Sequence, residues 1–123
     1  MTDAVKTRYL VVHMTDPTAE QWDDEVDSPA LQRWIDAGRT GERWELDGSP
    51  VGDRDTARSV VTRNGEVIVT DGPFPEQKEW FMGFDWIEAE SIDEAVAIVS
   101  THPSTKIGRL YVVPAAPLPE GVN

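Results

Sequence analysis

The stretch RSVVTRNGEVIVT, residues 58–70, carries the clearest local folding signal in the chain. Two short runs rich in β-branched residues flank the dipeptide Asn64-Gly65. A two-residue connection of this kind requires positive φ at both of its residues, which Asn and Gly tolerate, and it sets a tight β-hairpin register. The sequence therefore predicts a hairpin over residues 58–70.

Four other segments are predicted to be strands, because they are short, apolar and bounded by turn-forming residues. They are Tyr9–Met14, Arg43–Leu46, Trp80–Ala89 and Gly108–Val113. Residues 47–55 are rich in Asp and Gly and are predicted to be a loop. Gly83 interrupts the third of these strands, where a bulge or a close backbone approach is expected.

Helices are predicted between these strands. Residues 18–27 can form a helix, and Ser28-Pro29 is typical of the start of a second helical piece that ends at Gly38. A capping box at Ser91 and Glu94 predicts a further helix over residues 91–100. The element order favours an α+β sandwich with the helices on one face of the sheet. The other face is apolar, and we expect a second copy of the chain to cover it, which makes a homodimer.

Length and charge limit the possible functions. The chain has 123 residues, which fits one domain, with a core over about 8–114 and a loosely held tail over 115–123. It has 11 basic and 23 acidic residues, a net charge of −12 and no Cys. This charge argues against binding nucleic acid or an anionic membrane. With no predicted signal peptide or membrane span, we expect a soluble cytoplasmic protein.

The segment Asp71-Gly72-Pro73-Phe74, with Val69-Thr70 before it and Gly83 after it, resembles the motif of the DGPF family of YCII-related proteins. The resemblance covers about residues 9–114. It implies a ferredoxin-like α+β fold, with an antiparallel sheet and helices on one face, that dimerises sheet to sheet as dimeric α/β barrels do. The wider group, mostly bacterial, includes small enzymes of aromatic or lactone metabolism that use a His and an Asp. Other members are linked to alternative sigma factors.

Two functions from different classes follow. The first is a small-molecule site near Asp71, Asp85 and His13 that binds a polar or aromatic metabolite and acts on it by acid/base chemistry, without a cofactor. The second is a non-catalytic interaction module whose acidic surface contacts a partner protein, in connection with sigma-factor regulation.

Asp71 is the leading catalytic candidate, because a carboxylate on a rigid turn at a strand end can meet a ligand. The alternative is that it accepts hydrogen bonds from its own turn. Lys78 and Glu79 are candidate ligand-binding residues, and Lys78 is also placed to pair with Asp71. A solvated, ion-paired surface explains the same charges.

Asp85 lies in a strand that should be buried, so it either lines a cavity or has a raised pKa. Its neighbour Trp86 is included among the ligand-binding candidates. His13 is the second catalytic candidate, although a lone His on a strand is more often a core or interface group. His102 follows a helix and is expected to complement its carbonyl end. No spacing in the sequence matches a metal site or a phosphate-binding loop, so neither is predicted.

Overall fold

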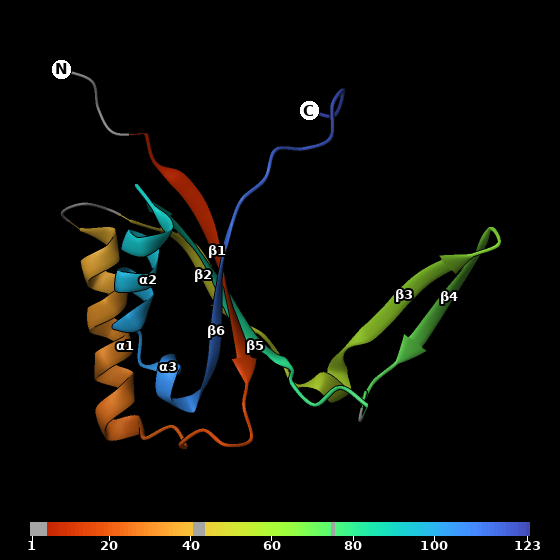
Figure 1. Cartoon of the computed structure of the whole chain (residues 1–123). Coiled ribbons are helices and arrows are strands. Elements are labelled where there is room, and N and C mark those ends of the chain that lie inside the picture. The colour runs from red at the N-terminus through yellow and green to blue at the C-terminus, as the bar shows by residue number, and fades with distance from the viewer. Residues whose placement is uncertain (1–4, 41–43, 75) are drawn as a thin grey trace.

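The computed structural model describes residues 5–40, 44–74 and 76–123. These residues form six strands and three α-helices, together with one short 3-10 helix, as Figure 1 shows. The elements are β1 (Thr7–Thr15), α1 (Asp24–Arg39), β2 (Glu45–Pro50), the 3-10 helix η1 (Arg54–Thr56), β3 (Arg58–Arg63), β4 (Glu66–Asp71), β5 (Phe81–Ala89), α2 (Ile92–Ser100), α3 (Ser104–Ile107) and β6 (Gly108–Pro114). None of these helices is long and apolar enough to cross a membrane.

Four strands form one antiparallel sheet in the order β2-β5-β1-β6. Helices α1 and α2 both lie on one face of this sheet (Figure 1). Without the hairpin, the chain order is β1, α1, β2, β5, α2, β6, and this order with this sheet is compatible with a ferredoxin-like fold. The α+β class and the one-sided helix layer are as the sequence predicted.

The core lies between the sheet and the two long helices. Side chains alternate along β1 and β5, so every second residue faces the helices and is buried. The buried apolar cluster consists of Tyr9, Val11, Trp34, Ile87, Ala89, Ala95 and Val99. The same alternation that buries these residues also carries polar residues of β1 and β5 to the helix side.

The predicted hairpin is confirmed as β3 and β4, with Arg63 paired to Glu66 across the turn. Asn64 and Gly65 have φ values of 52° and 77°, as this turn type requires. The hairpin forms a two-stranded sheet of its own, which projects from the body of the molecule (Figure 1). The sequence did not indicate this separation, because a hairpin signal is local and does not specify what the hairpin packs against.

Helix α1 is a single helix from Asp24 to Arg39, and the predicted break at Ser28-Pro29 is wrong. The helix begins at Asp24, so residues 18–23 of the predicted helical segment are not helical. Asp23 caps the helix by accepting a hydrogen bond from the backbone N–H of Glu25. Asp27 accepts a hydrogen bond from the backbone N–H of Asp23 and pairs with Lys106. These contacts stabilise the first turn, and the helix continues through Pro29, which lies in its second turn and has no N–H to bond the carbonyl of Glu25.

Strand β2 also differs from the prediction. It begins at Glu45 and continues to Pro50, so half of the expected loop over residues 47–55 is strand. Pairing with β5 overrides the low strand propensity of Asp, Gly and Pro, because β2 is an edge strand where such residues are tolerated. Arg43, predicted as the first residue of this strand, lies outside the described residues.

The remaining predictions hold more closely. Helix α2 begins after Ser91, whose hydroxyl accepts a hydrogen bond from the backbone N–H of Glu94. The expected close approach at Gly83 is confirmed, because a Cβ there would lie 2.7 Å from the carbonyl oxygen of Ser49. Phe74 is buried and its ring stacks on that of Trp80 at 5.6 Å. Its neighbour in the predicted turn, residue 75, lies outside the described residues.

Candidate functional site

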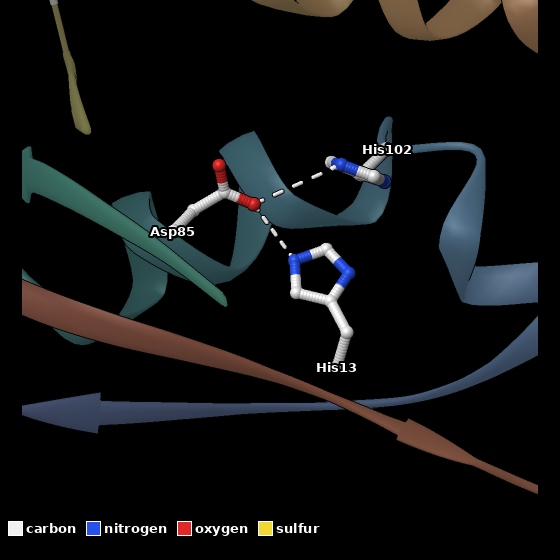
Figure 2. A group of neighbouring side chains, drawn as sticks. All are labelled: His13, Asp85 and His102. Carbon is white, nitrogen blue, oxygen red and sulfur yellow. Dashed lines mark hydrogen bonds and ion pairs between the residues drawn. The ribbon is translucent and has the colours of Figure 1, made fainter. Parts of the chain in front are cut away.

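Strands β1 and β5 bring His13 and Asp85 together on the helix side of the sheet. His13 is paired with Gly83 in the register and Val11 with Asp85, so the two polar side chains are diagonal neighbours. The Nε2 atom of His13 lies 2.7 Å from Oδ2 of Asp85, and Figure 2 shows this hydrogen bond. Both residues are buried, which strengthens the interaction.

His102 completes the cluster from the segment between α2 and α3 (Figure 2). Its Nε2 atom lies 3.9 Å from Oδ2 of Asp85, and its ring packs edge-on against those of His13 at 4.7 Å and Trp34 at 4.5 Å. The pKa of His102 is lowered to about 4, mainly by burial and secondly by repulsion from His13. His102 is therefore neutral at pH 7 and belongs to the site, whereas the sequence had suggested a helix-capping role.

Hydrogen bonding assigns the tautomers of both imidazoles. The backbone N–H of Ser104 donates to Nδ1 of His102 at 3.0 Å, so neutral His102 carries its proton on Nε2 and directs it toward Asp85. An ionised Asp85 only accepts hydrogen bonds, so neutral His13 donates through Nε2–H and keeps its lone pair on Nδ1. Asp85 therefore accepts a hydrogen bond from His13 and faces the Nε2–H of His102 across 3.9 Å, which is longer than a hydrogen bond.

Two His and one carboxylate are also a common ligand set for transition metals. The potential ligand atoms of His13, Asp85 and His102 lie within 4.8 Å of one another. A metal would need the lone pair of a ring nitrogen, with the other nitrogen donating to an acceptor. His102 has the opposite arrangement, because its Nδ1 accepts the Ser104 N–H. The donor set therefore favours a hydrogen-bonded network, and the absence of a metal stays a prediction.

The cluster lies in the wall of a cavity of about 290 Å³. Apolar side chains form most of the lining, and a few polar groups converge on it, as is typical of sites for small organic ligands. The lining residues with apolar side chains on the helix side are Trp22, Leu31, Ile35, Pro50 and Ile107. Strand β5 adds Met82 and Phe84 to the lining, although the alternation of the strand turns their side chains toward the other face of the sheet. The ionisable lining residues are His13, Arg39, Glu45, Asp85 and His102.

Gly48 on β2 has no side chain and so leaves the space that the carboxylate of Asp85 occupies. It is paired with Asp85 in the register, and a Cβ at this position would lie 2.2 Å from Oδ1 of Asp85. It would also lie 2.8 Å from the backbone oxygen of Phe84. Only glycine leaves room for the carboxylate to lie flat against β2 and reach His13.

Glu45 is a second carboxyl group of the cavity, and the sequence analysis did not single it out. Its Oε2 atom is buried and has no hydrogen-bond partner among the described residues. Burial first, and then the charge of Asp85, raise the pKa of Glu45 to about 8. No local signal marks this position, because Glu45 and Asp85 are 40 positions apart in the chain and come together through the pairing of β2 with β5.

The other predicted site residues lie away from this cavity. Asp71 is exposed on β4 and pairs with Arg58 across the hairpin at 2.9 Å, so the structure does not bring it to His13 and Asp85. Lys78 is exposed and Glu79 is half-buried in the turn before β5, and neither lines the cavity. Trp86 lies on the opposite face of the sheet, where the guanidinium of Arg8 stacks on its ring at 4.6 Å.

Comparison with known proteins agrees with the resemblance of the turn motif. The YCII-related domain matches residues 7–118, which is nearly the whole chain. An uncharacterized protein of Rhizobium meliloti (strain 1021) is 35% identical over 100 residues, which cover 75% of this chain and 76% of that protein. The DGPF name and the YCII-related name denote the same family. The chain therefore belongs to the family of proteins with a YCII-related domain.

Proposed function

We propose that the cavity binds a small, mostly apolar metabolite and that His13 exchanges a proton with it, held and oriented by Asp85. The hydrogen bond of 2.7 Å between the two residues, in the wall of a cavity, is the observation that carries this proposal. A carboxylate that fixes the tautomer of an imidazole leaves the second ring nitrogen as a base. In this chain that nitrogen is Nδ1 of His13.

The cavity also indicates the kind of ligand. Its volume of about 290 Å³ is at the lower end for small-molecule sites, which suits a ligand of one ring. Its apolar wall favours a hydrocarbon ring, and the few polar groups would orient a single polar substituent. Proton transfer to or from such a ligand, in an isomerisation or an elimination, requires no cofactor.

The test uses the same substitution at two carboxylates. Metabolites that bind the wild-type protein are first identified by native mass spectrometry of a metabolite mixture, and turnover is then followed. Asp85→Asn should lower turnover by about 10²- to 10⁴-fold, because the imidazole loses its orientation and charge partner. Asp71→Asn, on the projecting hairpin, should leave turnover unchanged. If Asp71→Asn is the damaging change, the site is on the hairpin. If no metabolite binds, the interaction-module function is favoured instead.

We also propose that a second copy of the chain covers the face of the sheet opposite the helices. Two cross-strand rows of apolar side chains lie on that face, none of them fully buried in the single chain. The rows are Phe84, Val12 and Tyr111, and Trp86, Leu10 and Val113. A contiguous apolar area of this kind is typical of an interface. Sheet-to-sheet contact through it would give the dimeric α/β barrel arrangement.

Sedimentation tests this dimer. The wild-type chain should sediment as a dimer at micromolar concentration, and Val12→Glu should sediment as a monomer, because a charge would be buried at the centre of the interface. Val67→Glu, on the exposed hairpin, is the control and should remain dimeric. A stable, folded wild-type monomer at micromolar concentration would contradict this proposal, and so would a dimer that only Val67→Glu dissociates.

A further inference from the structure

Glu45 reaches the cavity through an irregularity in β2. It is paired with Ile87, whereas Gly48 is paired with Asp85, and the register shifts between Glu45 and Asp47. A bulge of this kind places an extra residue on one strand and re-aims the side chains beside it. As a result Glu45 and Gly48 both line the cavity, although they are three positions apart and would face opposite sides of a regular strand.

Helix α1 packs tightly against this position. A Cβ at Gly38 would lie 2.6 Å from Cβ of Glu45, so a glycine is needed for α1 and β2 to lie so close together. The carboxyl group of Glu45 is thereby confined between α1 and Asp85. Its Oε2 atom is buried and accepts no hydrogen bond from the described residues.

The two carboxyl groups have unequal surroundings. Asp85 accepts from His13 and faces the N–H of His102, so its negative charge is compensated. Glu45 has no such donors, and an ionised oxygen buried without a partner is costly. When two carboxyl groups share one site, only one of them ionises readily, and here the proton belongs on Glu45.

The charged groups around Glu45 agree with this assignment. Asp85 on β5 and Asp47 on β2 favour its neutral form, while Arg39 on α1 opposes them with a smaller effect than that of Asp85. Burial is the largest cause of its pKa of about 8. The two His residues of the cluster interact with Asp85.

We propose that Glu45 is the proton donor of this cavity, a carboxylic acid that hydrogen-bonds to the carbonyl or phenolic oxygen of a small cyclic ligand while His13 takes a proton from the same ligand. This inference rests on the proposed function and names its ligand class. A neutral acid can donate to such an oxygen, whereas a carboxylate would repel its lone pairs. The apolar lining then holds the ring.

For a cyclic ketone the proton transfers balance without any further reactant. His13 Nδ1 removes a proton from the carbon next to the carbonyl, and the electrons of that C–H bond form a C=C bond. The carbonyl π electrons move to oxygen, which takes the proton of Glu45. The product is an enol, with Glu45 ionised and His13 protonated. In a β,γ-unsaturated cyclic ketone this enol is a dienol, so return of the proton from His13 to the γ carbon, and of the enol proton to Glu45, gives the conjugated α,β-unsaturated ketone and restores both groups.

The first arm of the test follows Glu45 itself. In protein with ¹³C-labelled Glu, the carboxyl carbon of Glu45, assigned by its absence in Glu45→Gln, should titrate near pH 8. Asp85→Asn should lower that midpoint toward the usual range of Glu. Asp47→Asn is the matched control and should change it less, because Asp47 is a weaker cause. A midpoint near 4.5 in the wild-type protein would overturn the proposal, as would a midpoint that Asp85→Asn leaves unchanged.

Stability provides a second readout of the same group. The folded state keeps a proton that the unfolded chain releases above its own pKa of about 4.5, so this group makes stability fall as pH rises from about 4.5 to 8. Glu45→Gln has no ionisable group at this position, so its free energy of unfolding, measured by urea titration, should not show this decrease with rising pH. Identical pH profiles for the two proteins would contradict the assignment.

The ligand arm compares acetophenone with α-methylstyrene, each at 1 mM, which have the same shape and differ in a carbonyl oxygen. Acetophenone should shift the amide signals of Gly48 and Gly83, and α-methylstyrene should shift them at least several-fold less. Glu45→Leu should abolish the difference, whereas Glu45→Gln, which still has a donor, should keep part of it. Equal binding of the two probes, or a preference that Glu45→Leu leaves intact, would overturn the role of Glu45 while leaving a ligand cavity in place. If neither probe binds, the ligand class is wrong, and if the metabolite mixture also gives no bound compound, the proposed function fails with it.

Discussion

Replacing Gly48 by Ala should disrupt the site, although Gly48 has no functional group and acts only through the space that it leaves for Asp85. The new methyl carbon would lie 2.2 Å from Oδ1 of Asp85, so the carboxylate has to move by roughly 1 Å to restore an ordinary contact. The backbone oxygen of Phe84, 2.8 Å from the same carbon, belongs to the paired strand and has little freedom to move. The displaced carboxylate would then lose its hydrogen bond of 2.7 Å to His13.

The expected cost has two parts. A buried hydrogen bond to a charged group contributes about 1.5–3 kcal/mol, and overpacking a tight site costs about 1–3 kcal/mol. We therefore expect Gly48→Ala to lower the free energy of unfolding by about 2.5–6 kcal/mol in urea titration. The ¹⁵N shifts of His13 should at the same time show its proton no longer confined to Nε2.

Gly52→Ala is the matched control for this substitution. Its Cβ would lie 3.2 Å from the hydroxyl of Thr56, which donates an exposed hydrogen bond to the backbone oxygen of Asp53 and needs to shift by only a few tenths of an ångström. The stability should change by less than about 0.5 kcal/mol and the His13 signals should not change. If Gly48→Ala and Gly52→Ala have the same small effect, the argument that glycine positions Asp85 is refuted.

Three other outcomes are expected. Phe74→Ala should cost about 3–5 kcal/mol of stability, because it removes a buried ring stacked on Trp80, and an unchanged melting temperature would show that Phe74 is not part of the core. Asp71→Asn should change stability by less than about 1 kcal/mol, because its pair with Arg58 is exposed, and a larger loss in thermal unfolding would mean that the pair is stronger than its exposure indicates. Because the pKa of His102 is lowered to about 4, the folded protein loses stability as pH falls from 6.5 to 4. The midpoint of urea unfolding should therefore fall more steeply over this range in the wild type than in His102→Gln. Parallel midpoints would contradict a buried neutral His102.

Local signals in the sequence predicted the elements well. The Asn64-Gly65 turn and the Ser91 cap depend on contacts within a few residues, so the sequence contains their causes. The break at Ser28-Pro29 was predicted wrongly, because the contact of Asp27 with Lys106 joins residues far apart in the chain. Strand β2 was assigned too short for the same reason, since its pairing with β5 decides its length.

The site was only partly predictable. Polar residues in apolar strands singled out His13 and Asp85, and the structure joins them. Glu45 and His102 were not assigned to the site, because their roles arise from the register of β2 and from the turn after α2. Asp71 is the leading candidate from the sequence because a carboxylate on a rigid turn can meet a ligand, but a turn signal is local and does not show which cavity, if any, the residue lines.

The turn motif at residues 71–74 lies at the base of the projecting hairpin. Gly72 donates its N–H to the carbonyl of Ala57 at 2.8 Å, and a Cβ on it would lie 2.3 Å from the carbonyl oxygen of Arg54. The motif is thus a joint between the hairpin and the sheet, separate from the cavity. Sharing this joint identifies chains with a common architecture and says little about a common reaction. Relatives of this chain are better grouped by what they carry at the positions of His13, Glu45, Asp85 and His102, because a change there would alter the chemistry while the joint stays the same.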